Sequence, residues 1–182
     1  MLLMIVFLMC VFVAVGTSVL AALSDLRGMV IPNSYSVIII VAFVVCFGAM
    51  WFSGRDDIFS SIWSHGLSAL IMFLVTLAMF GFKLIGAGDS KFGTALALWV
   101  GLKGLMPFVF YMSLVGGLLA IAALVLKKWK PLQHPKEGGW VAQVQSGASK
   151  VPYGVAIAIG ALVSFVKIGY FNPQVLVTFV GG

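Results

Sequence analysis

The stretch LLMIVFLMCVFVAVGTSVLAAL, residues 2–23, decides what kind of fold this chain can adopt. It contains no charged side chain, and about 20 predominantly apolar residues are what a helix needs to cross a hydrocarbon layer about 30 Å thick. The stretch lacks a positively charged start and is longer than the core of a signal peptide. We therefore interpret it as a retained membrane span.

Further apolar segments follow along the chain, and we place them at residues 35–52, 58–82, 86–102, 107–126 and 151–171. Each should be helical, because an open strand cannot satisfy its backbone hydrogen bonds in lipid. The expected fold is therefore an all-α, polytopic transmembrane helix bundle of about six spans.

The composition supports a membrane protein and no separate soluble module. Of 182 residues, 62% are hydrophobic and 9% are charged, whereas soluble domains carry about 25% charged residues. The apolar segments are spread evenly, so residues 1–182 are expected to form a single membrane domain. Residues 127–150 are its long basic loop, and residues 172–182 form a tail too short to cross again. The net charge of +6 does not indicate nucleic-acid binding, because no basic water-facing module is present.

The distribution of basic residues predicts the orientation. Eight lie in the loops after the odd-numbered spans and three lie on the opposite side, and the richer side should face the cytoplasm. Both termini would then lie outside the cytoplasm. The first group is Arg27, Lys83, Lys91, Lys127, Lys128, Lys130, Lys136 and Lys150, and the second is Arg55, Lys103 and Lys167.

Only two of the five acidic residues are candidates for chemistry. Asp56 and Asp57 fall in a short outer turn and Glu137 falls in the basic loop, where we expect all three to be solvated. Asp25 ends the first span. The free-energy cost of an acidic side chain is low at this place, so Asp25 can simply mark the boundary with water. Asp89 lies near the start of the fourth apolar segment, residues 86–102.

The length of the fourth segment places Asp89. If that helix began after Lys91, residues 92–102 would span only about 17 Å, too short to cross. A start at Gly86 gives about 25 Å, enough for a locally thinned bilayer, and puts Asp89 in the embedded first turn unless the segment is re-entrant. An acid at that depth is a functional candidate. Gly86 and Gly88 either make the turn into the helix or let another chain approach closely.

Two carboxyl groups at one membrane boundary suggest acid–base chemistry. Carboxyls held close together share a proton, so one can activate water while the other donates to a scissile carbonyl. No metal or cofactor is expected, because the sequence has no zinc-binding or serine-nucleophile motif. His65 and the tryptophans, including Trp99 and Trp140, are interpreted as interfacial residues. Two other functions stay open: a small proton-coupled carrier that uses the same acids, and a scaffold subunit of a secretion machine.

Four short elements follow one another in order along the chain: Asp25-x-Arg27, Ile31-Pro32-Asn33, Gly86-Ala87-Gly88-Asp89-Ser90-Lys91 and Val151-Pro152-Tyr153-Gly154. In these elements the chain resembles the type IV prepilin peptidases, which are membrane aspartyl proteases of the Gly-x-Gly-Asp type. The resemblance implies that Asp25 and Asp89 are catalytic. It further implies supporting or substrate-binding roles for Gly86, Gly88, Arg27, Pro32, Asn33, Lys91 and Pro152.

The resemblance also implies a substrate and a location. The substrate would be a pilin precursor with a basic leader before a hydrophobic helix, cleaved at the cytoplasmic face of the bacterial inner membrane. Membrane lipid and the pilus-assembly machinery would be further partners. The long members carry a cytoplasmic insert with paired Cys-x-x-Cys and also methylate their product. This chain has only Cys10 and Cys46 and no such insert, so it resembles the short peptidase-only branch associated with Flp-type pili.

Overall fold

The computed structural model describes residues 1–55 and 58–179, without the side chains of residues 175, 176 and 178. The described part is helical and contains no strand. Asp56 and Asp57, which we expected in a solvated turn, lie outside the described residues. The helices are α1 (Leu2–Gly28), α2 (Asn33–Phe52), α3 (Ile62–Gly81), α4 (Ala87–Trp129), α5 (Trp140–Gln145), α6 (Tyr153–Ile168) and α7 (Pro173–Thr178).

Four of these helices, α1 to α4, are long and apolar enough to cross a membrane by length and composition. Helix α6 is also apolar but has 16 residues, about 24 Å of helix. Large apolar side chains such as Leu20, Val44 and Leu74 are more than half exposed, as lipid-facing residues are. The chain is therefore a membrane protein, while six spans and outward-facing termini stay predictions.

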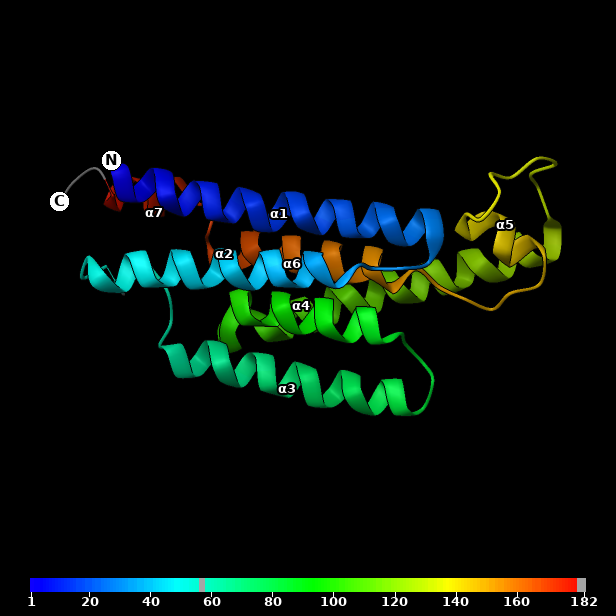
Figure 1. Cartoon of the computed structure of the whole chain (residues 1–182), viewed down its shortest axis with the longest axis horizontal. Helices are drawn as coiled ribbons and strands as arrows, with labels where there is room; N and C mark the ends of the chain where they lie inside the picture. Colours follow the sequence, from blue (N-terminus) through cyan, green and yellow to red (C-terminus); the bar gives the residue numbers. More distant parts are fainter. Residues whose placement is uncertain (56–57, 180–182) are drawn as a thin grey trace.

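The fourth and fifth expected segments both lie within α4 and are separated by a sharp reversal, which falls at Gly101 and not between residues 102 and 107. Gly101 interrupts this helix with φ 60° and ψ −176°, a conformation essentially restricted to glycine. Figure 1 shows the chain reversing direction within α4, so residues 87–100 and 102–129 run back along each other. The expected start at Pro107 is therefore wrong, because the second arm begins directly after Gly101. The first arm spans only about 21 Å.

Other boundaries also differ from those expected. Helix α3 begins at Ile62 instead of residue 58, because Phe59 leaves the helical path and is buried in the core. Helix α6 ends at Ile168 instead of residue 171, since Gly169 adopts a left-handed conformation with φ 94°. The long basic loop contains α5, and the tail contains α7.

The packing brings four helix ends together. Helix α4 packs against α2, α3 and α6, while α1 packs against α2 and α6. The end of α1, the start of α2, the α3–α4 connection and the start of α6 therefore gather at one end of the bundle, at the right of Figure 1. The N-terminus and α7 lie at the other end. The gathered ends contain the candidate acids.

Candidate active site

Asp25 lies in the last turn of α1 and is only 4% exposed. Its Oδ2 accepts a 2.7 Å hydrogen bond from the backbone N–H of Gly154, in the first turn of α6. The helix ends directly afterwards, because Met29 adopts a left-handed conformation and donates its N–H to the Asp25 carbonyl at 2.8 Å. Asp25 is therefore held between two helices, and is more than a polar marker of a helix end.

Asp89 lies in the first turn of α4, as the length argument predicted. Its Oδ2 accepts a 2.8 Å hydrogen bond from the N–H of Gly86, the residue that precedes the helix. A carboxylate at this position satisfies one of the N–H groups that a helix start leaves unpaired, and its charge is favourable there. The side chain is half-buried.

Both carboxyl groups line one cavity of about 370 Å³. Its other walls come from Met29, from residues 83–86 before α4, from residues 149–151 before α6 and from Tyr153, the first residue of α6. Lys83 and Lys150 add two ammonium groups to the lining. The cavity thus combines acidic and basic side chains at one end of the bundle.

The glycine motif packs against the turn between α1 and α2. A Cβ built on Gly88 would lie 3.1 Å from the Ile31 carbonyl oxygen and 3.4 Å from the Ile31 Cβ, so the glycine permits this close approach. Nearby, Lys91 Nζ donates to Asn33 Oδ1 at 3.1 Å. The structure thus brings together two predicted elements, residues 31–33 and 86–91.

The remaining predicted residues lie around the cavity or away from it. Pro152 is buried and immediately precedes α6, two residues before Gly154. Pro32 is exposed and immediately precedes α2. Arg27 is exposed and lines a separate cavity beside the long loop, together with Pro135 and Lys136. The structure does not place Arg27 in the lining of the aspartate cavity.

Several supporting contacts were not foreseen from the sequence. The N–H of Gly154 holds Asp25 across 129 residues of chain, and only the position of Gly154 in the Val151–Gly154 element pointed to it. Ser90, next to Asp89, forms a 2.8 Å hydrogen bond with Thr76 of α3. Small hydroxyl residues in apolar helices are the signal for such a contact.

Two tryptophans and one histidine contradict the interfacial interpretation. Trp99 is buried and donates to the Ile39 carbonyl at 2.9 Å, because its indole N–H needs a partner in the core. Trp140 of α5 is 8% exposed and donates to the Lys150 carbonyl at 2.9 Å, so α5 holds the segment that enters α6. His65 is 1% exposed, packed among aromatic rings.

No group of three or more histidine, cysteine, aspartate or glutamate side chains within residues 1–55 and 58–179 is arranged to hold a metal ion. Cys10 and Cys46 are buried as free thiols in α1 and α2. The lining of the aspartate cavity offers two carboxyl groups together with Lys83 and Lys150.

The chain is thus a membrane helix bundle with a cavity lined by two aspartates at one end. Comparison with protein families matches residues 10–121 to the Type IV leader peptidase family. The chain belongs to this family, which is a family of proteases. The match covers Asp25, Asp89 and the glycine motif and ends before α5 and α6. No curated protein and no solved structure matched the chain.

Proposed function

We propose that this chain is an aspartic-type endopeptidase that removes the basic leader from type IV, Flp-like prepilins. Asp25 and Asp89 are the catalytic residues in this proposal, and cleavage occurs at the cytoplasmic face of the bacterial inner membrane. One observation carries it: the two acids line the same cavity, each with one oxygen held by a glycine N–H.

The hydrogen bonds to the two aspartates support a choice of which carboxyl oxygens act in this mechanism. Gly154 N–H occupies Oδ2 of Asp25, and Gly86 N–H occupies Oδ2 of Asp89. The Oδ1 atoms are then the better places for the shared proton and for water. One carboxylate takes a proton from a water molecule while that water attacks the peptide carbonyl carbon. The other carboxyl donates its proton to the carbonyl oxygen. The pair titrates as a unit, so the roles belong to the dyad and not to either acid.

The position of the cavity suits a substrate with a polar leader and an apolar helix. It lies where α1 and α4 meet the end of the bundle, beside exposed apolar helix faces. The substrate's apolar helix can lie along the bundle in lipid while its leader junction reaches the carboxyls. Gly86 is exposed and lines the cavity without a side chain, which leaves the backbone before Asp89 accessible.

The alternative is a small proton-coupled carrier that uses the same two acids. A carrier needs its binding site near the membrane midplane, reached from both sides in turn. Both acids instead lie at one end of the bundle, which favours the peptidase.

The test uses the purified full chain with a prepilin that carries a basic leader before a hydrophobic helix. Wild-type protein should shorten the substrate on a gel. Asp25→Asn and Asp89→Asn should each lower the cleavage rate by about 10²–10⁴-fold, the usual contribution of general acid–base groups.

Glu137→Gln is the matched control, because it also neutralises one acid but lies exposed in the long loop. It should cleave at the wild-type rate. Normal cleavage by either aspartate variant would exclude the two-acid mechanism. Absence of cleavage by wild-type protein, together with proton uptake into vesicles, would support the carrier.

A further inference from the structure

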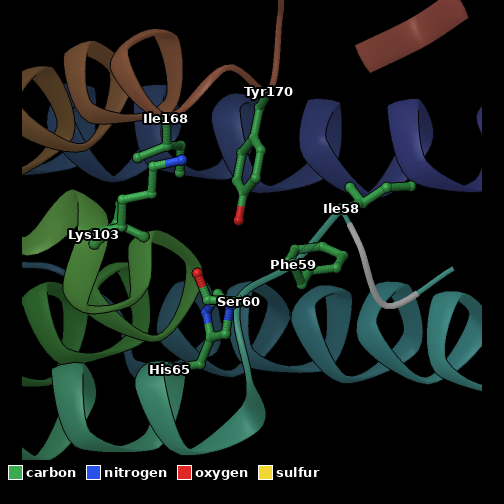
Figure 2. Close-up of a pocket in the computed structure, with 8 residues that line it drawn as sticks. Ile58, Phe59, Ser60, His65, Lys103, Ile168 and Tyr170 are labelled. Atoms are coloured by element: carbon green, nitrogen blue, oxygen red, sulfur yellow. The ribbon is translucent and has the colours of Figure 1, made fainter. Parts of the chain in front are cut away.

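A second polar cavity, of about 180 Å³, lies at the end of the bundle opposite the two aspartates. Figure 2 shows its lining, which comes from the segment before α3 and the first turn of α3, from the reversal of α4, and from the end of α6 and the segment after it. Its volume exceeds what a single water needs and is below the roughly 300–1,000 Å³ of drug-sized ligand pockets. The cavity therefore suits a small polar group.

His65 supplies a hydrogen-bond acceptor without a partner. Its Nδ1 lies 2.7 Å from the Leu98 carbonyl oxygen, which can only accept, so Nδ1 must be the donor. The neutral ring then carries a lone pair on Nε2. This atom is buried and has no hydrogen-bond partner in the part of the chain that the structure describes. A buried polar atom left unpaired costs about 1–3 kcal/mol, so a ligand donor at this position would be stabilised.

Tyr170 supplies a second acceptor. Its hydroxyl donates to the Trp99 carbonyl at 2.7 Å, which leaves the oxygen lone pairs for another group. In Figure 2 this hydroxyl points toward the side of the cavity where His65 and Ser60 lie. Phe59 packs against both rings, with centroid separations of 5.7 Å to His65 and 5.7 Å to Tyr170. Acceptor atoms and an aromatic ring together suit an ammonium group, which donates hydrogen bonds and is attracted to aromatic rings.

Lys103 restricts which ammonium ligand can bind. It also lines the cavity, its side chain is exposed, and no carboxylate among the described residues lines the same space. A ligand with positive charge alone would be repelled by this lysine. A ligand that also carries an anionic group would pair that group with Lys103 at the rim and place its ammonium deeper.

Two exposed tryptophans lie on elements next to the cavity. Trp63 precedes His65 by two residues and is 83% exposed, and Trp51 near the end of α2 is 56% exposed. Exposed tryptophans are typical of the level at which lipid headgroups lie. We infer that this cavity binds a phosphoethanolamine group, with the ammonium at His65 and Tyr170 and the phosphate at Lys103. The group could come from an aminophospholipid or from a soluble phosphoethanolamine.

Lipid titration of the full chain tests this inference without reference to proteolysis. The purified protein is mixed in detergent with phosphatidylethanolamine, phosphatidylcholine or phosphatidylglycerol, and bound lipid is counted by native mass spectrometry. Phosphatidylethanolamine should bind about tenfold more tightly than the others, which corresponds to one lost charge-assisted hydrogen bond. Phosphatidylcholine has no N–H to donate, and phosphatidylglycerol has no ammonium. Soluble phosphoethanolamine is tested separately by its effect on the melting temperature.

Binding of the lipid alone would identify an aminophospholipid as the source, and stabilisation by the soluble compound would show that the headgroup suffices. Equal affinity for all three lipids together with no effect of phosphoethanolamine would overturn the inference.

Two variants and a control test the residues. Lys103→Met should weaken phosphatidylethanolamine binding about tenfold, whereas Lys167→Met, an exposed lysine outside the cavity lining, should not change it. His65→Asn can keep a donor for the Leu98 carbonyl while it removes Nε2, and should also weaken binding. If His65→Asn does not fold, Lys103→Met still tests the inference, because the Lys103 side chain is exposed and its replacement should not disturb folding. Wild-type binding by Lys103→Met would overturn the assigned phosphate contact and with it the inference.

Discussion

Gly154→Ala tests whether the position of Asp25 determines cleavage. A Cβ on this residue would lie 2.7 Å from Ile31 Cδ1 and 2.9 Å from Asp25 Oδ2. The backbone N–H that bonds to Asp25 remains in the variant. The substitution therefore adds one methyl group against the proposed catalytic carboxylate and removes no hydrogen-bonding group.

The magnitude follows from these distances. Ordinary contact begins at about 3.4 Å, so the Asp25 oxygen must move from 2.9 Å by at least half an ångström. A misplacement of about 1 Å can lower a rate by 10²-fold, so half of that should lower cleavage by about tenfold. The crowding should also reduce the free energy of unfolding by about 1–3 kcal/mol.

Prepilin cleavage and thermal unfolding are measured on the same preparation, so that the rate can be expressed per folded molecule. Gly104→Ala is the control, since its Cβ would lie 2.7 Å from Ser164 Oγ and 2.8 Å from Val100 Cβ, away from the acids. It should lower the melting temperature comparably and leave the rate per folded molecule unchanged.

Ile31→Val in the Gly154→Ala background separates the two clashes. It removes the Cδ1 atom, so part of the stability should return while the slow cleavage persists. Wild-type cleavage by Gly154→Ala would refute the reasoning, as would an equal loss of cleavage in Gly104→Ala.

Three further outcomes follow from described contacts. Gly88→Ala must push its new Cβ away from the Ile31 carbonyl at 3.1 Å, so cleavage should fall several-fold, and an unchanged gel assay would contradict this. Gly101→Ala forces a residue with a side chain into φ 60°, ψ −176°, and should lower the free energy of unfolding by about 1–3 kcal/mol. A melting temperature equal to that of wild type would show that the reversal of α4 tolerates other residues. Trp140→Phe removes the 2.9 Å bond to the Lys150 carbonyl and should lower the free energy of unfolding in denaturant by about 1 kcal/mol, whereas no change would mean that water replaces the indole.

The helices were largely predictable, because a membrane span needs a long apolar run that few other structures require. The reversal within α4 was also expected, because Lys103, Gly104 and Pro107 separate two apolar segments there. Its form was not predictable: the chain contains 21 glycines, and the choice of Gly101 for the positive-φ conformation depends on packing. The burial of Trp99 was also missed, because apolar surroundings look the same in a lipid-facing helix as in a buried one.

The acids could be predicted individually, and their surroundings could not. Asp25 was selected because the sequence has only five acidic residues. Asp89 was placed in the first turn of its helix because a later start would leave that helix too short to cross the membrane. The bond between Asp25 and Gly154 depends on how α6 packs against α1, which no local pattern specifies. The contact between Gly88 and Ile31 has the same origin, since it joins two turns that meet only after the bundle assembles.

The tight turn between α1 and α2 limits where residues can be inserted into the chain. Helix α1 ends at Gly28 and α2 begins at Asn33, and Ile31 between them touches both Gly88 and, through its side chain, the neighbourhood of Gly154. An inserted residue there would shift the partners of both acids together. Epitope tags and insertions are better placed in the exposed part of the loop before α5, and natural variation in chain length should accumulate there too.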